Sequence, residues 1–85
     1  MFAIVRYRME SIDSDVELDI VEVCSKEGDA TEYLTMTVED DFNGVNLYDE
    51  VEGKWEWDME DVKDEELKDQ LDEHYLFYHI KICEV

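Results

Sequence analysis

The sequence predicts a single α+β domain over residues 1–85, with a mostly antiparallel sheet and two helices in the order β-β-α-(β-β)-α-β. Three observations indicate this class. Both ends of the chain alternate in polarity as β-strands do, and two inner segments repeat their apolar residues at helical spacing. Leu, Ile, Val and Phe number 23 of the 85 residues, which is enough apolar side chain for one small core.

Strands are expected at both ends of the chain. Phe2–Met9 alternates apolar with mixed positions, and Val16–Cys24 is rich in β-branched residues. Turn-forming residues 10–15 separate the two segments, so we expect them to pair as a hairpin. The last segment, Leu76–Val85, carries apolar residues on both faces, which is typical of a central or covered strand. The sheet is therefore expected to have three to five strands, with the C-terminal strand inside it.

Residues 29–44 admit two interpretations. As a helix, the segment has Asp29 as N-cap and Asn43-Gly44 as its C-terminal stop. The apolar face of that helix comprises Tyr33, Leu34, Val38 and Phe42. As a strand, apolar positions alternate with threonines between residues 34 and 38, and Asn43-Gly44 forms a hairpin turn. We expect the helix, because the cap, the stop and the 3.6-residue period agree.

The segment after residue 44 is expected to begin with irregular structure and to end in a second helix. Val45–Tyr48 and Lys54–Trp57 are short strand-like pieces on either side of Glu52-Gly53, which indicates a small hairpin or an extended loop. Asp58 then provides the N-cap of a helix that runs to about His74. Its first turn is acidic, as the helix dipole favours.

Negative charge is the most unusual property of the sequence. The chain has 26 Asp and Glu against 7 Lys and Arg, for a net charge of −19. Residues 39–74 alone contain 16 acidic and 3 basic residues. Nucleic acid and anionic membrane surfaces both require cationic contact faces, so direct binding to either is excluded. The composition instead favours a basic protein partner.

The second expected helix carries an acidic row. At 100° per residue, Leu67, Leu71 and Tyr75 point to one side. The opposite side carries a row of carboxylates: Asp61, Glu65, Asp69 and Asp72. Residues 60–73 contain eight carboxylates, or about one charge per 2.6 Å of helix, which approaches the value of about 1.7 Å for duplex DNA. Because such a row repels itself, a helix selected only for folding would interleave lysine.

Further candidates for partner contact lie on either side of residue 45 and before the second helix. The acidic candidates are Glu39, Asp40, Asp41, Asp49, Glu50 and Glu52. Trp55 and Trp57 are two residues apart, so on a strand they face the same way. They either cover the core beneath the acidic helix or provide an exposed anchor, a role in which tryptophan is enriched at interfaces. The sequence leaves both interpretations open.

We expect no enzymatic, metal or cofactor site. Glycine-rich phosphate loops, GxSxG and HExxH are all missing from the sequence. His79 and Cys83 would lie more than about 13 Å apart on a strand, too far for one metal ion. Cys24 and Cys83 form no CxxC motif, so free thiols in a reducing cytoplasm are expected. The N-terminus has no signal-peptide pattern, and no apolar run is long enough to span a membrane.

In size and charge, with the acidic segments Glu39–Asp41 and Glu60–Glu73, the chain resembles the phage-encoded DNA-mimic inhibitors. These include anti-CRISPR, anti-restriction and uracil-glycosylase inhibitor proteins. The resemblance implies a non-enzymatic inhibitor in the host cytoplasm that occupies the basic nucleic-acid-binding groove of a nuclease or Cas complex. The alternative is an acidic adaptor or regulatory module that binds a basic protein partner unrelated to nucleic acid.

Overall fold

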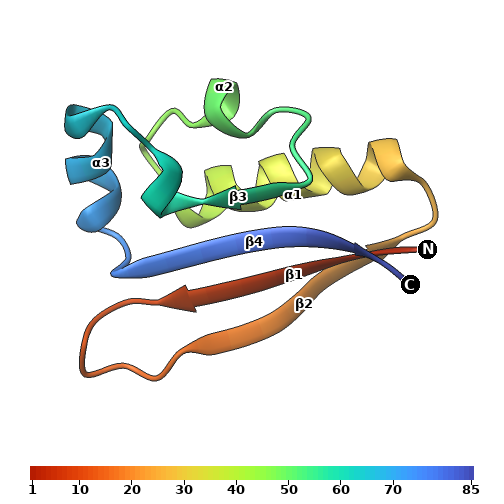
Figure 1. Ribbon diagram of the computed structural model, residues 1–85, viewed down its shortest axis with the longest axis horizontal. Coiled ribbons are helices and arrows are strands. Elements are labelled where there is room, and N and C mark those ends of the chain that lie inside the picture. Colours follow the sequence, from red (N-terminus) through yellow and green to blue (C-terminus); the bar gives the residue numbers. More distant parts are fainter.

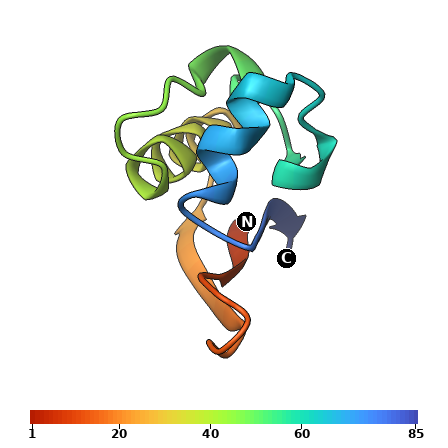
Figure 2. The ribbon, with the colours of Figure 1, turned by 90° about the vertical axis from the view of Figure 1, so that its left-hand side faces the viewer.

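Four antiparallel strands form one sheet, and helices cover one of its two faces (Figures 1 and 2). The computed structural model describes residues 1–85. The strands are β1 (Phe2–Met9), β2 (Glu17–Cys24), β3 (Glu56–Asp58) and β4 (Phe77–Glu84), in the spatial order β2-β1-β4-β3. The helices are α1 (Glu27–Asp41), α2 (Tyr48–Val51) and α3 (Glu65–Asp72), with the 3₁₀ turn η1 at Met59–Asp61. The α+β class and the antiparallel sheet are confirmed.

The strands at the chain ends lie where the sequence predicts them. β1 and β2 pair as an antiparallel hairpin, with a bulge where the register shifts between Ile4 and Val5. β4 lies between β1 and β3, so its central position is also confirmed. Tyr78, Ile80 and Ile82 on β4 are buried beneath the helices. Both chain termini meet at the same end of the sheet, as Figure 1 shows.

Residues 29–44 are mainly helical, as expected, but the helix begins earlier than predicted. α1 starts at Glu27 after the N-cap Lys26, which makes no capping hydrogen bond with its side chain. Asp29 therefore lies in the first turn, where a carboxylate interacts favourably with the helix dipole, and it is not the N-cap. The helix ends at Asp41, and Gly44 has a φ of 92°, which glycine adopts without a steric penalty. The expected stop at Asn43-Gly44 is thus confirmed to within two residues.

The apolar face of α1 forms the centre of the core. Leu34, Val38 and Phe42 are fully buried, whereas Tyr33 is 42% exposed. The ring of Phe42 makes edge contacts with Trp57, Tyr75 and Tyr78, at centroid distances of 4.9–5.8 Å. One cluster of 16 buried residues joins α1 to the sheet and to α3.

The segment between α1 and β3 differs from the prediction. Val45–Tyr48 is not a strand, because Leu47 is the N-cap of a helical turn in which the backbone N–H of Val51 donates to the carbonyl of Leu47 (3.2 Å), with both side chains fully buried. The short helix α2 forms there. β3 pairs with β4 and forms no local hairpin. The middle of the chain therefore contributes one strand to the sheet instead of two.

The second predicted helix is interrupted. Asp58 caps only the 3₁₀ turn η1, whose Met59 is fully buried. The chain is then extended at Val62, which is also buried, and Asp64 caps the shorter helix α3 with hydrogen bonds to the backbone N–H groups of Glu66 and Leu67. Residues 56–58 pair with β4 and are extended, and the extended backbone of Val62 (φ −73°, ψ 122°) separates the 3₁₀ turn from α3. Within α3, Leu71 is buried and Leu67 packs partly buried against the core, as predicted.

Candidate partner-binding surface

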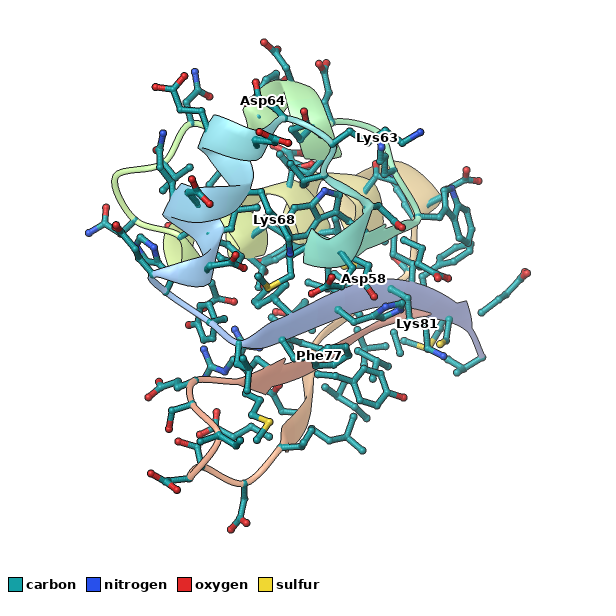
Figure 3. The ribbon with its side chains drawn as sticks, turned by 60° about the vertical axis from the view of Figure 1, so that its left-hand side comes forward. Asp58, Lys63, Asp64, Lys68, Phe77 and Lys81 are labelled. Carbon is teal, nitrogen blue, oxygen red and sulfur yellow. The ribbon has the colours of Figure 1, made fainter.

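Three of the four carboxylates in the predicted acidic row remain together on α3. Glu65, Asp69 and Asp72 lie on this helix and are exposed. Asp61 ends the 3₁₀ turn and so lies outside the helical row. Lys68 is the only basic residue on α3. It bridges to Asp72 on the same helix (3.5 Å) and to Glu60 on η1 (3.2 Å); Lys68 is labelled in Figure 3.

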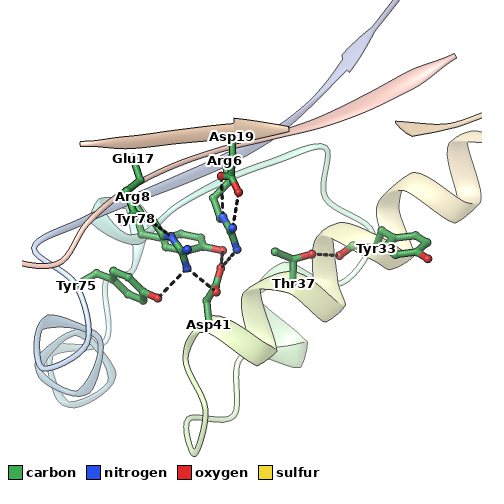
Figure 4. A network of polar contacts seen from close by, with 9 residues as sticks. All are labelled: Arg6, Arg8, Glu17, Asp19, Tyr33, Thr37, Asp41, Tyr75 and Tyr78. Carbon is green, nitrogen blue, oxygen red and sulfur yellow. Dashed lines mark hydrogen bonds and ion pairs between the residues drawn. The ribbon is translucent and has the colours of Figure 1, made fainter. Parts of the chain in front are cut away.

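Asp41 belongs to the interior of the molecule. Its carboxylate accepts hydrogen bonds from Arg6 Nη1 (2.8 Å) and Arg8 Nη1 (3.1 Å), and the hydroxyl of Tyr78 also donates to it (Figure 4). Its side chain is 11% exposed. The neighbouring Asp40 is exposed and Glu39 partly exposed. Of the run 39–41, two residues are therefore on the surface and one holds the last turn of α1 onto β1.

The groups around Asp41 have strongly perturbed pKa values. Burial raises the pKa of Tyr78 far above its usual range, and the bond to Asp41 adds to this, so the hydroxyl stays protonated and remains a donor. Burial acts to lower the pKa of Arg6, but its hydrogen bonds to Asp19 and Asp41 outweigh that effect and raise it. The same contact with Arg6 lowers the pKa of Asp19. This cluster is charge-compensated and structural.

The candidates on and beside α2 are on the surface. Asp49 and Glu50 occupy the first turn of α2, where acidic residues favour the helix, and Glu52 is its C-cap. The nearby charge of Glu52 raises the pKa of Tyr48. Tyr48 is 46% exposed. A partly exposed aromatic ring therefore lies among these carboxylates.

Two grooves flank α1, and neither is predicted by the sequence patterns. The first, of about 460 Å³, lies between α1 and the end of β2. The second, of about 390 Å³, lies between α1 and α2. Both are lined by Glu32 and Met36, with Tyr33 in the first and Tyr48 in the second. Their carboxylates are Glu22, Asp29, Glu32, Glu39 and Glu52.

The two tryptophans have different environments. Trp57 is buried in the core, where its ring contacts Phe42 and Tyr78. Trp55 is 37% exposed, packs its ring edge-on against Phe2 at 5.6 Å, and donates a hydrogen bond from Nε1 to Glu27. Only Trp55 therefore presents surface to a partner.

Most of the negative charge has no basic partner. Five of the 26 acidic residues form ion pairs with Arg or Lys: Glu17, Asp19, Asp41, Glu60 and Asp72. We use the name acidic helical surface for eleven exposed or partly exposed carboxylates on α1 after its first turn, on α2 and α3, and at the C-caps of α2 and α3, without the Asp41 of the arginine cluster. It comprises Glu32, Glu39, Asp40, Asp49, Glu50, Glu52, Glu65, Glu66, Asp69, Asp72 and Glu73. Only Asp72 in this set has an ion-pair partner.

The remaining polar groups do not point to a catalytic centre. No group of three His, Cys, Asp or Glu side chains is arranged to hold a metal ion. Both cysteines are free thiols, and burial raises the pKa of Cys24, so that thiol is a poor nucleophile at neutral pH. No helix is long and apolar enough to cross a bilayer. Comparison with models of known protein families, with curated proteins and with solved structures found no match to this chain.

Proposed function

We propose that this protein is a non-enzymatic inhibitor that acts in the host cytoplasm and occupies the nucleic-acid-binding groove of a nuclease or Cas-type complex. One observation supports the proposal above the others. The acidic helical surface gathers eleven carboxylates on the helical layer, and a single lysine, Lys68, forms an ion pair within it. A protein that required charge only for solubility would be expected to intersperse both signs.

The spacing of these charges is close to that of a nucleic-acid backbone. Residues 65–73 contain five carboxylates: Glu65, Glu66, Asp69, Asp72 and Glu73. At 1.5 Å per residue they occupy about 14 Å, or about 2.7 Å per charge. A groove that binds duplex DNA is built to neutralise one charge per about 1.7 Å. Lys68 offsets one of these charges, so the net charge of the helix is −4, or about one charge per 3.4 Å, which is the spacing along a single DNA strand.

The grooves beside α1 supply contacts that charge alone does not. Tyr33, Met36 and Tyr48 are 42%, 52% and 46% exposed, and each lies among carboxylates. Aromatic side chains and methionine are enriched at the centre of protein interfaces, where they are ringed by polar groups. These side chains would pack against the aliphatic stems of Lys and Arg residues of the partner, while the surrounding carboxylates pair with the charged ends of those residues.

The same grooves favour a second function, an acidic adaptor that binds a basic protein segment unrelated to nucleic acid. Competition separates the two. The protein would be immobilised, its partner captured from a host lysate, and the partner then titrated with a labelled DNA duplex in the presence and absence of this protein. Mutual exclusion is expected for an inhibitor of the kind proposed. A ternary complex with DNA would reject mimicry and support the adaptor.

Charge reversal tests whether the acidic helical surface makes the contact. Glu65→Lys/Asp69→Lys on α3 and Glu39→Lys/Asp40→Lys on α1 change the net charge equally and alter no ion pair. Each is expected to weaken binding to the captured partner by about 10-fold or more, through lost charge complementarity.

The matched control is Asp13→Lys/Asp15→Lys, in the exposed loop between β1 and β2. It makes the same change in net charge away from the helices, so its effect on partner binding is expected to stay below about 3-fold. A thermal melt of each variant verifies folding. Equal losses in all three variants would show that binding depends on net charge and not on this surface.

A further inference from the structure

The strand β2 forms a free edge of the sheet. It pairs with β1 on one side and with no strand on the other (Figure 1). Its eight residues include no lysine or proline, the residues that proteins commonly place on an edge strand to prevent further pairing. Near its end, the backbone N–H of Val23 donates to the side chain of its neighbour Glu22 (3.1 Å), so a side chain satisfies this donor. The outer edge of β2 is therefore open to an added strand.

The two sides of β2 differ in chemistry, because acidic and apolar residues alternate along the strand. Cross-strand partners point to the same face of a sheet. Beyond the bulge, Glu22 is paired with the buried Ile4 and so lies on the helical side. Two further acids on that side, Glu17 and Asp19, form ion pairs with arginines of β1. The uncovered side carries three apolar residues that are 62%, 65% and 42% exposed: Leu18, Ile20 and Val23.

The groove of about 460 Å³ between α1 and the end of β2 lies beside this edge. It is lined by three carboxylates: Glu22, Asp29 and Glu32. None of them forms an ion pair, and no Lys or Arg lines the groove. From residue 17 to residue 39 the chain has seven acidic residues and one basic residue, Lys26. Tyr33 and Met36 add exposed apolar surface to the groove. A cationic side chain of a partner would therefore find carboxylates for its charge and apolar contacts for its stem.

We propose that an extended segment of the basic partner adds to the free edge of β2 as a further strand, with basic and apolar residues in alternation. Side chains of an added strand point alternately to the two faces of the sheet. On the helical side they would be Lys or Arg, packed against Tyr33 and Met36 and paired with the carboxylates of the groove. On the other side they would be apolar, next to the exposed apolar residues of β2. A carbonyl of the segment would accept the N–H of Val23, which frees the carboxylate of Glu22 to pair with a cation.

The same charges select against a second copy of this chain at the edge. Pairing β2 with β2 of another copy would bring acidic side chains together on the helical side, and like charges on adjacent strands destabilise the pair. The added strand rests on the proposed function in one respect, which is that the partner is basic. Backbone pairing with β2 is a contact that charge mimicry by the helices does not need, so the two are tested separately.

A synthetic peptide is the probe for this contact. It alternates lysine with valine over about eight residues, carries a fluorescent label, and is titrated with the full chain up to about 1 mM. Saturable binding is expected by fluorescence anisotropy at about 0.1 M NaCl. A second peptide has the same composition, with its lysines in one block and its valines in another. It is expected to bind at least about 10-fold more weakly, because only alternation puts basic and apolar groups on opposite faces of a strand.

Methylation of the peptide backbone tests whether the contact is a strand pairing. Alternate N–H groups of a strand point to the same edge, so methylating the backbone nitrogens of all lysines, or of all valines, removes the donors from one edge. One of these two peptides is expected to lose at least about 10-fold in affinity. Hydrogen exchange gives the matching readout on the protein. The amides of β2 that face away from β1 are expected to exchange more slowly when the alternating peptide is bound.

Charge reversal on the protein locates the basic side chains of the peptide. Glu22→Lys/Glu32→Lys changes two carboxylates of the groove and is expected to weaken binding of the alternating peptide by at least about 10-fold. The matched control, Glu65→Lys/Asp69→Lys on α3, makes the same change in net charge and is expected to weaken it by less than about 3-fold. Neither variant removes an ion pair, and a thermal melt verifies that each is folded.

Four results would each overturn the added strand. Two of them are an absence of saturable binding and equal binding of the alternating and block peptides. The third is that neither methylated peptide binds more weakly, which would leave charge attraction without backbone pairing. The fourth is an equal loss in both charge-reversal variants, which would make binding depend on net charge and not on the groove. Exclusion of DNA from the captured partner is a separate measurement, so the added strand and the proposed function can each fail without the other.

Discussion

Asp41 shows how one residue in an acidic run can differ in role from its neighbours. The sequence groups it with Glu39 and Asp40 as a candidate for partner contact, but the structure places it between two arginines and a tyrosine. The signal was present in the spacing, because Asp41 lies three residues after the buried Val38 and so shares its side of α1. Alternation along β1 likewise puts Arg6 and Arg8 on the same side as the buried Ile4.

Removing the charge of Asp41 is expected to destabilise the fold. Asp41→Asn leaves Arg6 and Arg8 facing each other, at 13% and 24% side-chain exposure, without their shared carboxylate. Breaking a partly buried ion cluster from one side costs about 2–4 kcal/mol of unfolding free energy. Urea unfolding at neutral pH would measure it.

The control for this measurement is Asp40→Asn, one residue earlier on α1. Asp40 is exposed and has no ion-pair or hydrogen-bond partner, so its neutralisation is expected to change stability by less than about 0.5 kcal/mol, or to raise it slightly through relief of repulsion. If the two variants unfold at the same urea concentration, the cluster around Asp41 contributes nothing to stability.

At the scale of elements, the start of α3 shows that a sequence pattern can offer two possible N-caps for one helix. Both Asp58 and Asp64 are suitable N-caps, and the structure uses both, each for its own turn. The capping pattern does not reveal that residues 56–58 pair with β4, and this pairing requires the chain to turn before the helix begins. The shorter helix removes Asp61 from the acidic row but keeps Glu65, Asp69 and Asp72 in it.

The cap of α3 can be tested separately from its charge. Asp64→Ala removes the acceptor of two backbone hydrogen bonds (3.0 and 3.2 Å) and is expected to lower the unfolding free energy by about 1 kcal/mol. Asp64→Ser removes the same negative charge but keeps an acceptor, so it is expected to retain most of the stability. An equal loss in both variants would mean that charge at the helix dipole, and not the cap, is what Asp64 supplies.

The regular periodic segments were predictable from the sequence, and the short ones were not. β1, β2, α1 and β4 have at least eight residues each, and their apolar patterns place them correctly. α2 and β3 have four and three residues, too few for a period to appear, and only tertiary contacts of Leu47, Val51 and Trp57 define them. The two surface grooves could not be predicted either, because they form where α1 meets the end of β2 and where α1 meets α2.

At the scale of the whole molecule, the two sides of the sheet have opposite character. One side carries the helices with the acidic helical surface, and the other carries mainly apolar strand residues, with Glu56, Asp58, His79 and Lys81 at one corner. A basic partner attracted by charge is therefore expected to contact the helical side and not the uncovered side of the sheet.

Folding of this molecule is expected to become more stable as salt is added. Like charges forced into a compact body repel one another, and NaCl screens exposed pairs more than partly buried ones such as Arg6–Asp41. If screening supplies about 1 kcal/mol between about 0.02 and 0.5 M NaCl, the melting temperature rises by about 4–8 °C for a domain of this size. Melts are recorded at the same low protein concentration in every salt. The control neutralises four exposed acids that form no hydrogen bond or ion pair (Asp13→Asn/Asp40→Asn/Asp69→Asn/Glu73→Gln), and its rise with salt is expected to be clearly smaller, because less repulsion remains to screen. A parent melting temperature that stays flat or falls with salt would show that the −19 charge costs the fold nothing, and would remove the physical reason for assigning a binding role to its acidic helical surface.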